Sequence, residues 1–175
     1  MSTQAVPMPP RTSKGSTRAL ALAERLEQGA KALADFAATL TDAEWRTPIG
    51  ARDARPVGVV IHHVATVYPI EIGLAQTLAA GKPVTGVTME DIAVMNAGHA
   101  KDNAGVGKLE TIELLRRNSM AAAAVIRILT DEQLDKAAPA SLYFEAPITC
   151  QFMLEDHAVR HSYHHLSRIR AALKR

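Results

Sequence analysis

The sequence predicts an all-α protein in which four long helices form a bundle. Alanine and leucine are abundant, whereas aromatic residues make up only 4% of the 175 residues. This composition favours helices over strands, which prefer aromatic and β-branched residues. Apolar residues also recur at helical spacing in four separate stretches. The segments 40–45 (LTDAEW) and 129–134 (LTDEQL) resemble each other, and each follows a long helical stretch. Two similar helix pairs would form a four-helix bundle with pseudo-two-fold symmetry.

The boundaries of the four helices follow from their apolar stripes and end signals. The first stripe includes Leu22, Leu26 and Leu33. Pro56 is well placed to start the second helix, because proline is tolerated in a first turn. Thr149 is a plausible N-cap of the fourth helix. We expect helices over about 16–40, 56–80, 108–129 and 150–173, with residues 46–55 as a loop.

A long connection, residues 81–107, joins the second and third helices, and Thr88 is placed to cap a short helix through Ala100. Connections of this length in a small domain often cover a functional site. Residues 1–14 are polar and rich in proline, so we expect a disordered N-terminal tail. The folded domain is then residues 15–175.

Charge and composition restrict the classes of binding partner and the cellular location that we expect. The net charge is +2, from 20 Lys and Arg against 18 Asp and Glu, which gives no electrostatic reason to expect nucleic acid. No run of about 18 apolar residues indicates a membrane span, and the N-terminus is unlike a signal peptide. The single cysteine, Cys150, excludes an internal disulfide and is expected to be a packing residue. We therefore expect a cytoplasmic protein that binds neither nucleic acid nor membranes.

Four of the seven histidines lie within nine residues of the fourth helix. On a helical wheel, His161 and His165 share a stripe with Leu154, Ala158 and Ile169. The other two, at positions 157 and 164, lie at the edge of this stripe. Buried imidazoles need a partner, and two of them one turn apart can converge on one ion.

The same test separates the two adjacent histidines of the second helix. His63 shares its face with Val59, Val60 and Val67, whereas His62 shares a weaker face. We therefore expect His63 to point inward and His62 outward.

Three inward imidazoles, His63, His161 and His165, predict a site for one divalent metal ion, with zinc or nickel favoured and iron or manganese as alternatives. Three protein ligands leave an open coordination position, as catalysis requires. Two other interpretations stay open: a non-catalytic bundle that binds metal or a small ligand, and a structural dimer with packing histidines. The roles of His99, His157 and His164 stay open as well.

The sequence resembles the DinB-like family, whose relatives include bacillithiol transferases and mycothiol-dependent maleylpyruvate isomerases. The resemblance covers most of residues 16–173 and lies in segments 62–65 (HHVA), 161–166 (HSYHHL), 92–97 (IAVMNA) with His99, and 40–45. It implies a four-helix bundle with a long crossover between helices two and three. It also implies a metal held by His63, His161 and His165. After His165 the chain reads Leu-Ser-Arg-Ile where a common family version has Arg-Gly-Gln-Ile.

Together these features predict a metal-dependent enzyme acting on a small molecule. By resemblance, the reaction is transfer of a low-molecular-weight thiol or a hydrolysis, and the assembly is a homodimer. Neither histidine pair of the fourth helix is an HExxH motif, because the glutamate is missing. Glu71 and Asp156 are the carboxylates nearest in sequence to the expected ligands, and either could orient a ligand imidazole.

Overall fold

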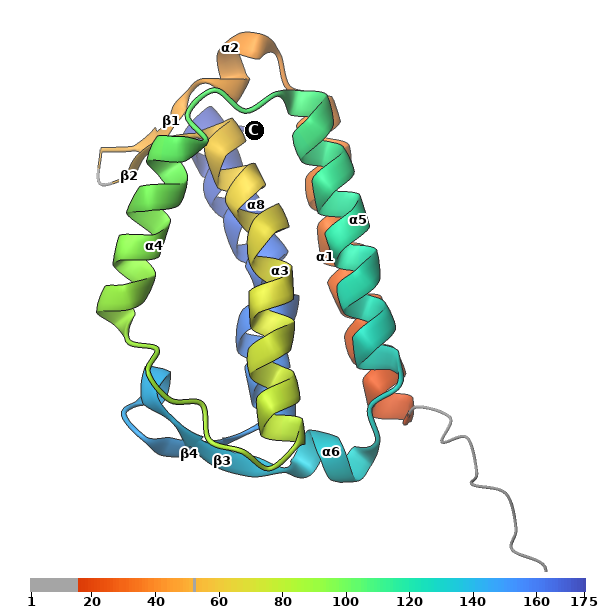
Figure 1. The fold of residues 1–175 in the computed structure, drawn as a ribbon. Helices are drawn as coiled ribbons and strands as arrows, with labels where there is room; N and C mark the ends of the chain where they lie inside the picture. Colours follow the sequence, from red (N-terminus) through yellow and green to blue (C-terminus); the bar gives the residue numbers. More distant parts are fainter. Residues whose placement is uncertain (1–15, 52) are drawn as a thin grey trace, which may run out of the picture.

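The computed structural model describes residues 16–51 and 53–175, so the tail expected over residues 1–14 lies outside the described residues. The predicted four-helix bundle is confirmed (Figure 1). α1 and α5 lie side by side, and α3 lies beside α8. The four long helices are α1 (Thr17–Ala38), α3 (Val57–Ala79), α5 (Lys108–Arg127) and α8 (Arg160–Leu173).

The short repeated sequence corresponds to a repeated structure. α2 (Asp42–Trp45) follows α1, and α6 (Asp131–Asp135) follows α5. Thr41 caps α2 in a reciprocal capping box with Glu44, and Thr130 caps α6 in the same way with Gln133. In each case the threonine side chain accepts from a backbone N–H, and the partner side chain accepts from the threonine N–H.

Two short β-hairpins correct the expected connections. Residues 46–55 were expected to be a loop, but β1 (Pro48–Gly50) pairs there antiparallel with β2 (Asp53–Pro56). β3 (Ala137–Ala140) pairs with β4 (Ala146–Thr149) around a 3₁₀ turn, Ser141–Tyr143. These strands are three or four residues long and contain proline, glycine or alanine, so they lack the alternating pattern that reveals a strand.

The fourth long helix is not the single α-helix that the sequence predicted over 150–173. α7 (Cys150–Met153) is followed by a π-helical segment, Leu154–Val159, and then by α8. Thr149 caps α7 as expected. A π-helical turn has no apolar period of its own to read from a sequence, and such turns are frequent at functional sites.

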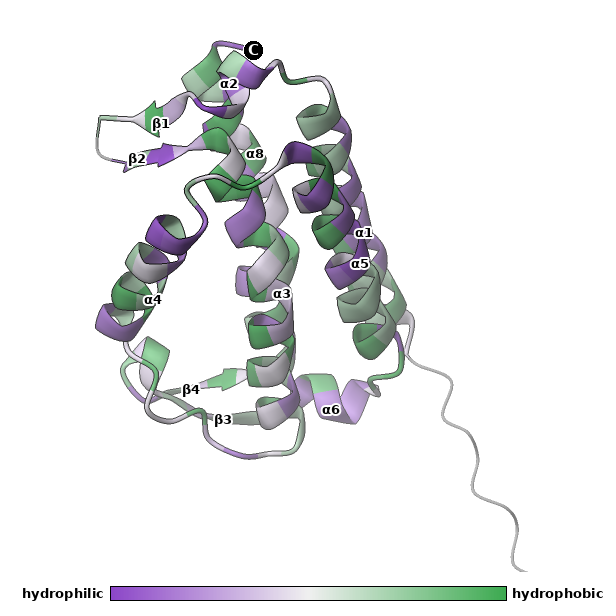
Figure 2. Ribbon diagram, turned by 45° about the horizontal axis from the view of Figure 1, so that its top comes forward, coloured by the Kyte–Doolittle hydropathy of each residue, from purple (hydrophilic) through white to green (hydrophobic). Residues whose placement is uncertain are grey.

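The crossover between the second and third long helices is confirmed, and α4 (Met89–Asp102) lies within it, capped by Thr88 and Asp91. No residue of α4 is buried, and Figures 1 and 2 show the helix set apart from the bundle. A parallel β-bridge between Val84 and Ala140 holds the start of the crossover against β3. The crossover is therefore joined to the second hairpin at its start.

α3 is the core helix of the bundle. It is the most continuously hydrophobic of the long helices in Figure 2, and most of its residues are buried. Pro69 lies within the helix without ending it. α3 is long and apolar enough to cross a membrane, but 67% of its most apolar window is buried inside the protein. Its hydrophobicity is thus accounted for by the core, as in a soluble protein.

Candidate metal centre

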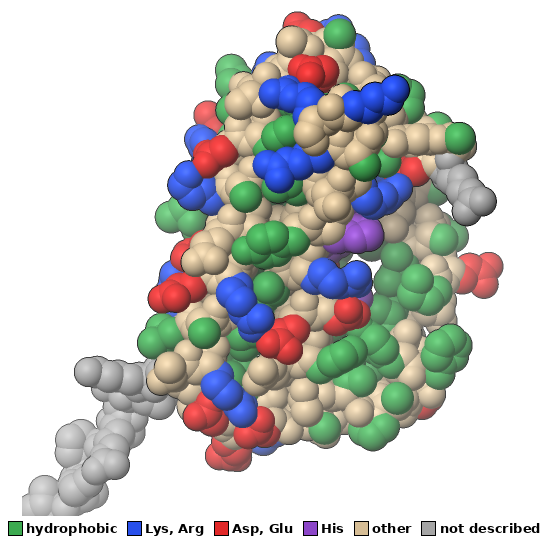
Figure 3. Space-filling model, turned by 180° about the vertical axis from the view of Figure 1, so that it is seen from behind, with side chains coloured by type: hydrophobic (Ala, Val, Ile, Leu, Met, Phe, Trp, Pro, Cys, Tyr) green, Lys and Arg blue, Asp and Glu red, His purple; other side chains and the backbone are tan. Residues whose placement is uncertain are grey.

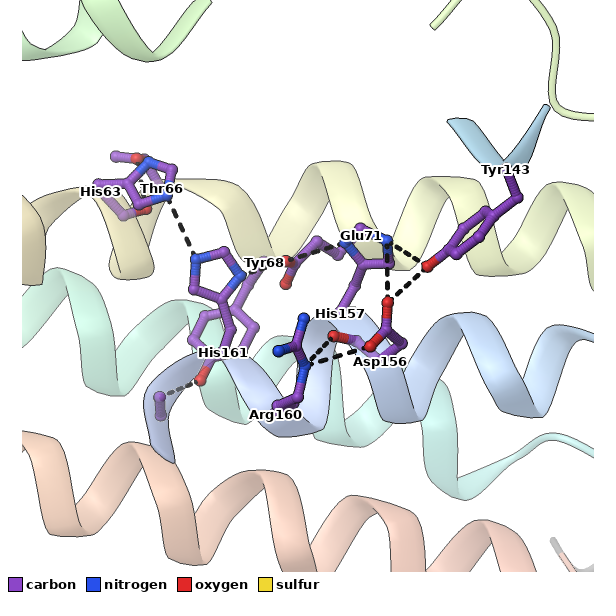
Figure 4. A network of polar contacts seen from close by, with 10 residues as sticks. His63, Thr66, Tyr68, Glu71, Tyr143, Asp156, His157, Arg160 and His161 are labelled. Atoms are coloured by element: carbon purple, nitrogen blue, oxygen red, sulfur yellow. Dashed lines mark hydrogen bonds and ion pairs between the residues drawn. The ribbon is translucent and has the colours of Figure 1, made fainter. Parts of the chain in front are cut away.

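Three imidazoles converge where α3 passes α8. His63 comes from α3, and His161 and His165 come from successive turns of α8. Each offers one ring nitrogen, and these three nitrogens lie within 4.8 Å of one another. Nε2 of His63 lies 3.2 Å from Nε2 of His161, and Figure 4 shows the two rings facing each other. The structure therefore brings together the three histidines that the sequence placed on inward faces.

The environment of two of these rings, His63 and His165, favours neutral imidazoles. His63 and His165 are each only 6% exposed. Burial lowers the pKa of His63 to about 3 and that of His165 to about 2, and the nearby His161 adds to both shifts. A neutral imidazole is the form that binds a metal ion. Among the described residues, Nδ1 of His165 is buried and has no hydrogen-bond partner. The set of donors thus fits a divalent cation that prefers nitrogen ligands.

Glu71 orients one of the three rings. Its side chain is buried on α3 and accepts a hydrogen bond from Nδ1 of His161 at 2.5 Å. Because the proton sits on Nδ1, the lone pair of His161 is left on Nε2, the atom that faces His63. A carboxylate in this position fixes the tautomer and increases the basicity of a ligand histidine. Of the two candidate carboxylates, Glu71 is the one in contact with the site.

A second polar network continues from Glu71 along the π-helical segment (Figure 4). Nδ1 of His157 lies 4.0 Å from Oε1 of Glu71, and Nε2 of His157 lies 2.9 Å from the hydroxyl of Tyr143. This hydroxyl donates to Oδ2 of Asp156 at 2.6 Å, and Arg160 pairs with the same carboxylate. Sequence reasoning missed Tyr143 because it lies in the 3₁₀ turn, where no periodic pattern marks it.

Three further histidines lie outside the cluster: His62 and His99 contact each other between α3 and α4, and His164 is on the surface. His62, expected to point outward, is only partly buried, and its Nδ1 lies 2.9 Å from Nε2 of His99 on α4. His164 is exposed, in agreement with its position away from the stripe. Cys150 is fully buried, and burial raises the pKa of its thiol to about 11, so it is a packing residue as expected.

The three imidazoles face a cavity of about 510 Å³ between α3, α4 and the π-helical segment. A volume of this size suits a small-molecule ligand. The space-filling view in Figure 3 shows a hollow on the back of the molecule, with a histidine and basic side chains at its rim and hydrophobic side chains beside it. Residues 63, 161 and 165 line the cavity together with Arg55, Val67, Ile70, Glu71, Leu74, Val87, Met89, Asp91, Ile92, Met95, Asn96, Leu142 and His157.

Comparison with solved structures identifies this arrangement of helices. YfiT from Bacillus subtilis superposes with a TM-score of 0.74 over 95% of this chain and 92% of its own. The chain has the fold of YfiT. That protein is described as "a probable metal-dependent hydrolase with an unusual four-helix bundle topology". The two sequences are 21% identical, so the likeness establishes the fold alone. No protein-family model and no curated protein matches the sequence.

Proposed function

We propose that the protein is a metal-dependent enzyme of the DinB-like family that acts on a small molecule in the cavity beside α4. The observation that carries this proposal is the convergence of His63, His161 and His165 on one cavity wall, with nitrogens within 4.8 Å of one another. Among the described residues the cluster contains three histidines and no fourth ligand, which leaves room for a water or substrate atom. Zinc and nickel suit this set of ligands best.

The residues of the chain have separable tasks in this proposal. A divalent ion at the three imidazoles would lower the pKa of a water or thiol in its open position. Glu71 holds the proton of His161 at Nδ1 and keeps its ring directed at the site. The apolar wall of the cavity, including Val67 and Leu74, excludes water around a bound substrate. His157 lines the cavity, and its hydrogen bond with Tyr143 links it to a second group that can donate or accept a proton.

Two reaction classes are compatible with this arrangement, hydrolysis and transfer of a low-molecular-weight thiol. The described activity of YfiT favours hydrolysis, and the sequence resemblance to the DinB-like family favours thiol transfer. Both need an activated nucleophile at the open position and a cavity that admits a small substrate. A panel of esters and amides, run beside a panel of thiols with an electrophilic acceptor, distinguishes them.

The test uses tag-free protein stripped of metal and titrated with zinc or nickel by calorimetry. We expect about one ion per chain, together with turnover in one of the two substrate panels that depends on the added metal. Metal binding without turnover in either panel would contradict an enzyme and favour a non-catalytic metal-binding bundle. Absence of metal binding would contradict the proposal altogether.

We further propose that the protein acts in the cytoplasm as a homodimer, with each metal site inside one bundle. Three large apolar side chains on or next to α5 are exposed, namely Leu109, Met120 and Ile128, at 65–75%. Closed two-fold pairing is the commonest soluble assembly. Light scattering at micromolar concentration should give about twice the 18.8 kDa chain mass. A monomer mass with full metal content would reject the dimer alone.

A further inference from the structure

Arg55 brings a positive charge to the wall of the cavity. It lies on β2, directly before α3, and its side chain is 22% exposed. Among the described residues that line the cavity, it is the only lysine or arginine. The same cavity is lined by His63, His161 and His165.

The charge of Arg55 is only partly balanced. Asp53 accepts from Nε and Nη2 of Arg55, each at 2.8 Å, and also from Nη2 of Arg168 at 2.9 Å. The two guanidinium groups, with Arg55 as the larger influence, hold the pKa of Asp53 well below its usual range against the opposing effect of burial. Two cations therefore share one carboxylate. Arg168 faces a separate surface hollow, so the excess positive charge next to the cavity is that of Arg55.

Each of the two carboxylates that line the cavity already has a hydrogen-bond donor. Oε1 of Glu71 accepts from Nδ1 of His161, while its Oε2 has no partner among the described residues. Asp91 closes the capping box with Thr88 at the start of α4. Most of the remaining lining is apolar, including Ile70, Leu74, Ile92, Met95 and Leu142. A cation beside an apolar wall interacts strongly with an anionic ligand, because little water screens it. On Arg55, Asp53 occupies the N–H of Nε and one N–H of Nη2, so the N–H groups of Nη1 and the second N–H of Nη2 remain as donors for a carboxylate.

We propose that the cavity selects small ligands with an apolar body and a carboxylate, and that Arg55 binds this carboxylate. The apolar body lies against the α3 and α4 side chains, and the other end of the ligand faces the three histidines. This inference rests on the proposed function for the reactive end of the ligand, but recognition of the carboxylate depends on Arg55 and needs no metal. Arg55 is thus a specificity-determining residue.

A matched pair of probes tests the inference: 4-(mercaptomethyl)benzoate and 4-(mercaptomethyl)benzamide, which have the same shape and differ in charge. Calorimetry measures their binding to zinc-loaded and to metal-free protein. We expect the benzoate to bind about tenfold more tightly than the benzamide in both forms, as for a charged hydrogen-bonded pair. Arg55→Gln should remove this difference and leave zinc content unchanged.

Two further variants keep the test decisive. Arg168→Gln removes the other partner of Asp53 and should retain the benzoate preference, because this side chain does not line the cavity. If Arg55→Gln does not fold, the double variant Arg55→Gln/Asp53→Asn avoids an unpaired carboxylate and should show the same loss of preference.

The outcomes separate the inference from the proposed function. Equal binding of the two probes to wild-type protein, or a preference that survives Arg55→Gln or the double variant, would overturn the role of Arg55 even if zinc is bound. A protein that binds no zinc but keeps the Arg55-dependent preference would overturn the proposed metal site and leave this inference standing.

Discussion

The first half of the molecule (residues 16–79) and the second half (residues 108–173) contain the same secondary-structure elements in the same order. Each has a long helix, a one-turn helix with a threonine capping box, a β-hairpin and a histidine-bearing helix. Even the entry to the last helix is alike: Val57 N–H donates to the Thr47 carbonyl, and Cys150 N–H donates to the Lys136 carbonyl.

The halves differ in what their last helices contribute to the site. α3 supplies one imidazole, His63, and the orienting carboxylate Glu71. The second half supplies two imidazoles, His161 and His165, after a π-helical segment that has no counterpart in α3. The two halves thus share one structural frame, meaning the repeated helices and hairpins, but they contribute different numbers of metal-site residues. Paired substitutions in the two halves therefore separate effects on the stability of this frame from effects on the metal site.

The largest expected effect concerns the frame. Trp45 packs on the backbone of α3 at Gly58, where an added Cβ would lie 2.2 Å from the indole, and its Nε1–H donates to the Val106 carbonyl. Its counterpart, Leu134, is fully buried. Trp45→Ala should lower the free energy of unfolding by about 3–5 kcal/mol, and Leu134→Ala by about 2–5 kcal/mol. Urea denaturation measures both, and a loss below about 1 kcal/mol in either would contradict the packing described for that half.

The next effect concerns the carboxylates. Glu71 touches a ligand imidazole, whereas Asp156 of the second half pairs with Tyr143 and Arg160. Glu71→Gln should weaken zinc binding by about 10- to 100-fold, as expected for a carboxylate that orients a ligand histidine. Asp156→Asn is the matched control and should leave the zinc affinity largely unchanged. Competition with a chromophoric chelator measures both variants, and equal losses would remove the distinction between the two carboxylates.

Acid should destabilise the metal-free protein through one histidine from each half. The pKa of His63 is about 3 and that of His165 about 2, both lowered mainly by burial from an ordinary value of 6.5. The unfolded chain therefore binds more protons below pH 6.5, so stability is full above this pH and falls steadily toward pH 3. Melting temperatures of metal-free protein between pH 7.5 and 4 should decline, and the slope should decrease in a His63→Gln variant. A slope identical to that of wild type would exclude His63 as a source of the pH-dependent loss of stability.

The smallest effect concerns the caps. Thr41→Ala and Thr130→Ala each remove a side chain that accepts from a backbone N–H at a helix start. Each should lower the free energy of unfolding by about 1 kcal/mol without changing metal affinity. Chemical denaturation with a parallel zinc titration checks both quantities. A loss of zinc affinity in either variant would show that the frame and the site are coupled.

The sequence revealed the long helices and the inward histidines because both rest on period and composition. Leu22, Leu26 and Leu33 mark the buried face of α1, and the valines around His63 distinguish it from His62. It did not reveal the hairpins or the π-helical segment, since these depend on pairing and on tertiary position and not on a local pattern.

Some residues near the site could not be predicted from a local sequence pattern either. Arg55 lines the cavity from a short strand, and Tyr143 contacts the lining residue His157 from a 3₁₀ turn. Only the fold brings these two residues near the site. His62 was expected to face outward because the outward face of α3 looked weak, but α4 covers part of it through His99. The packing of a crossover helix that buries none of its own residues cannot be read from the period of α3.

Metal content of a neighbouring pair of variants tests the central claim most directly. His164 and His165 are adjacent on α8, but His164 is exposed and His165 lies in the three-histidine cluster. Elemental analysis of tag-free proteins equilibrated with zinc should show about one ion per chain for wild type and for His164→Ala, and almost none for His165→Ala. Equal zinc content in the two variants would contradict a metal site formed by His63, His161 and His165.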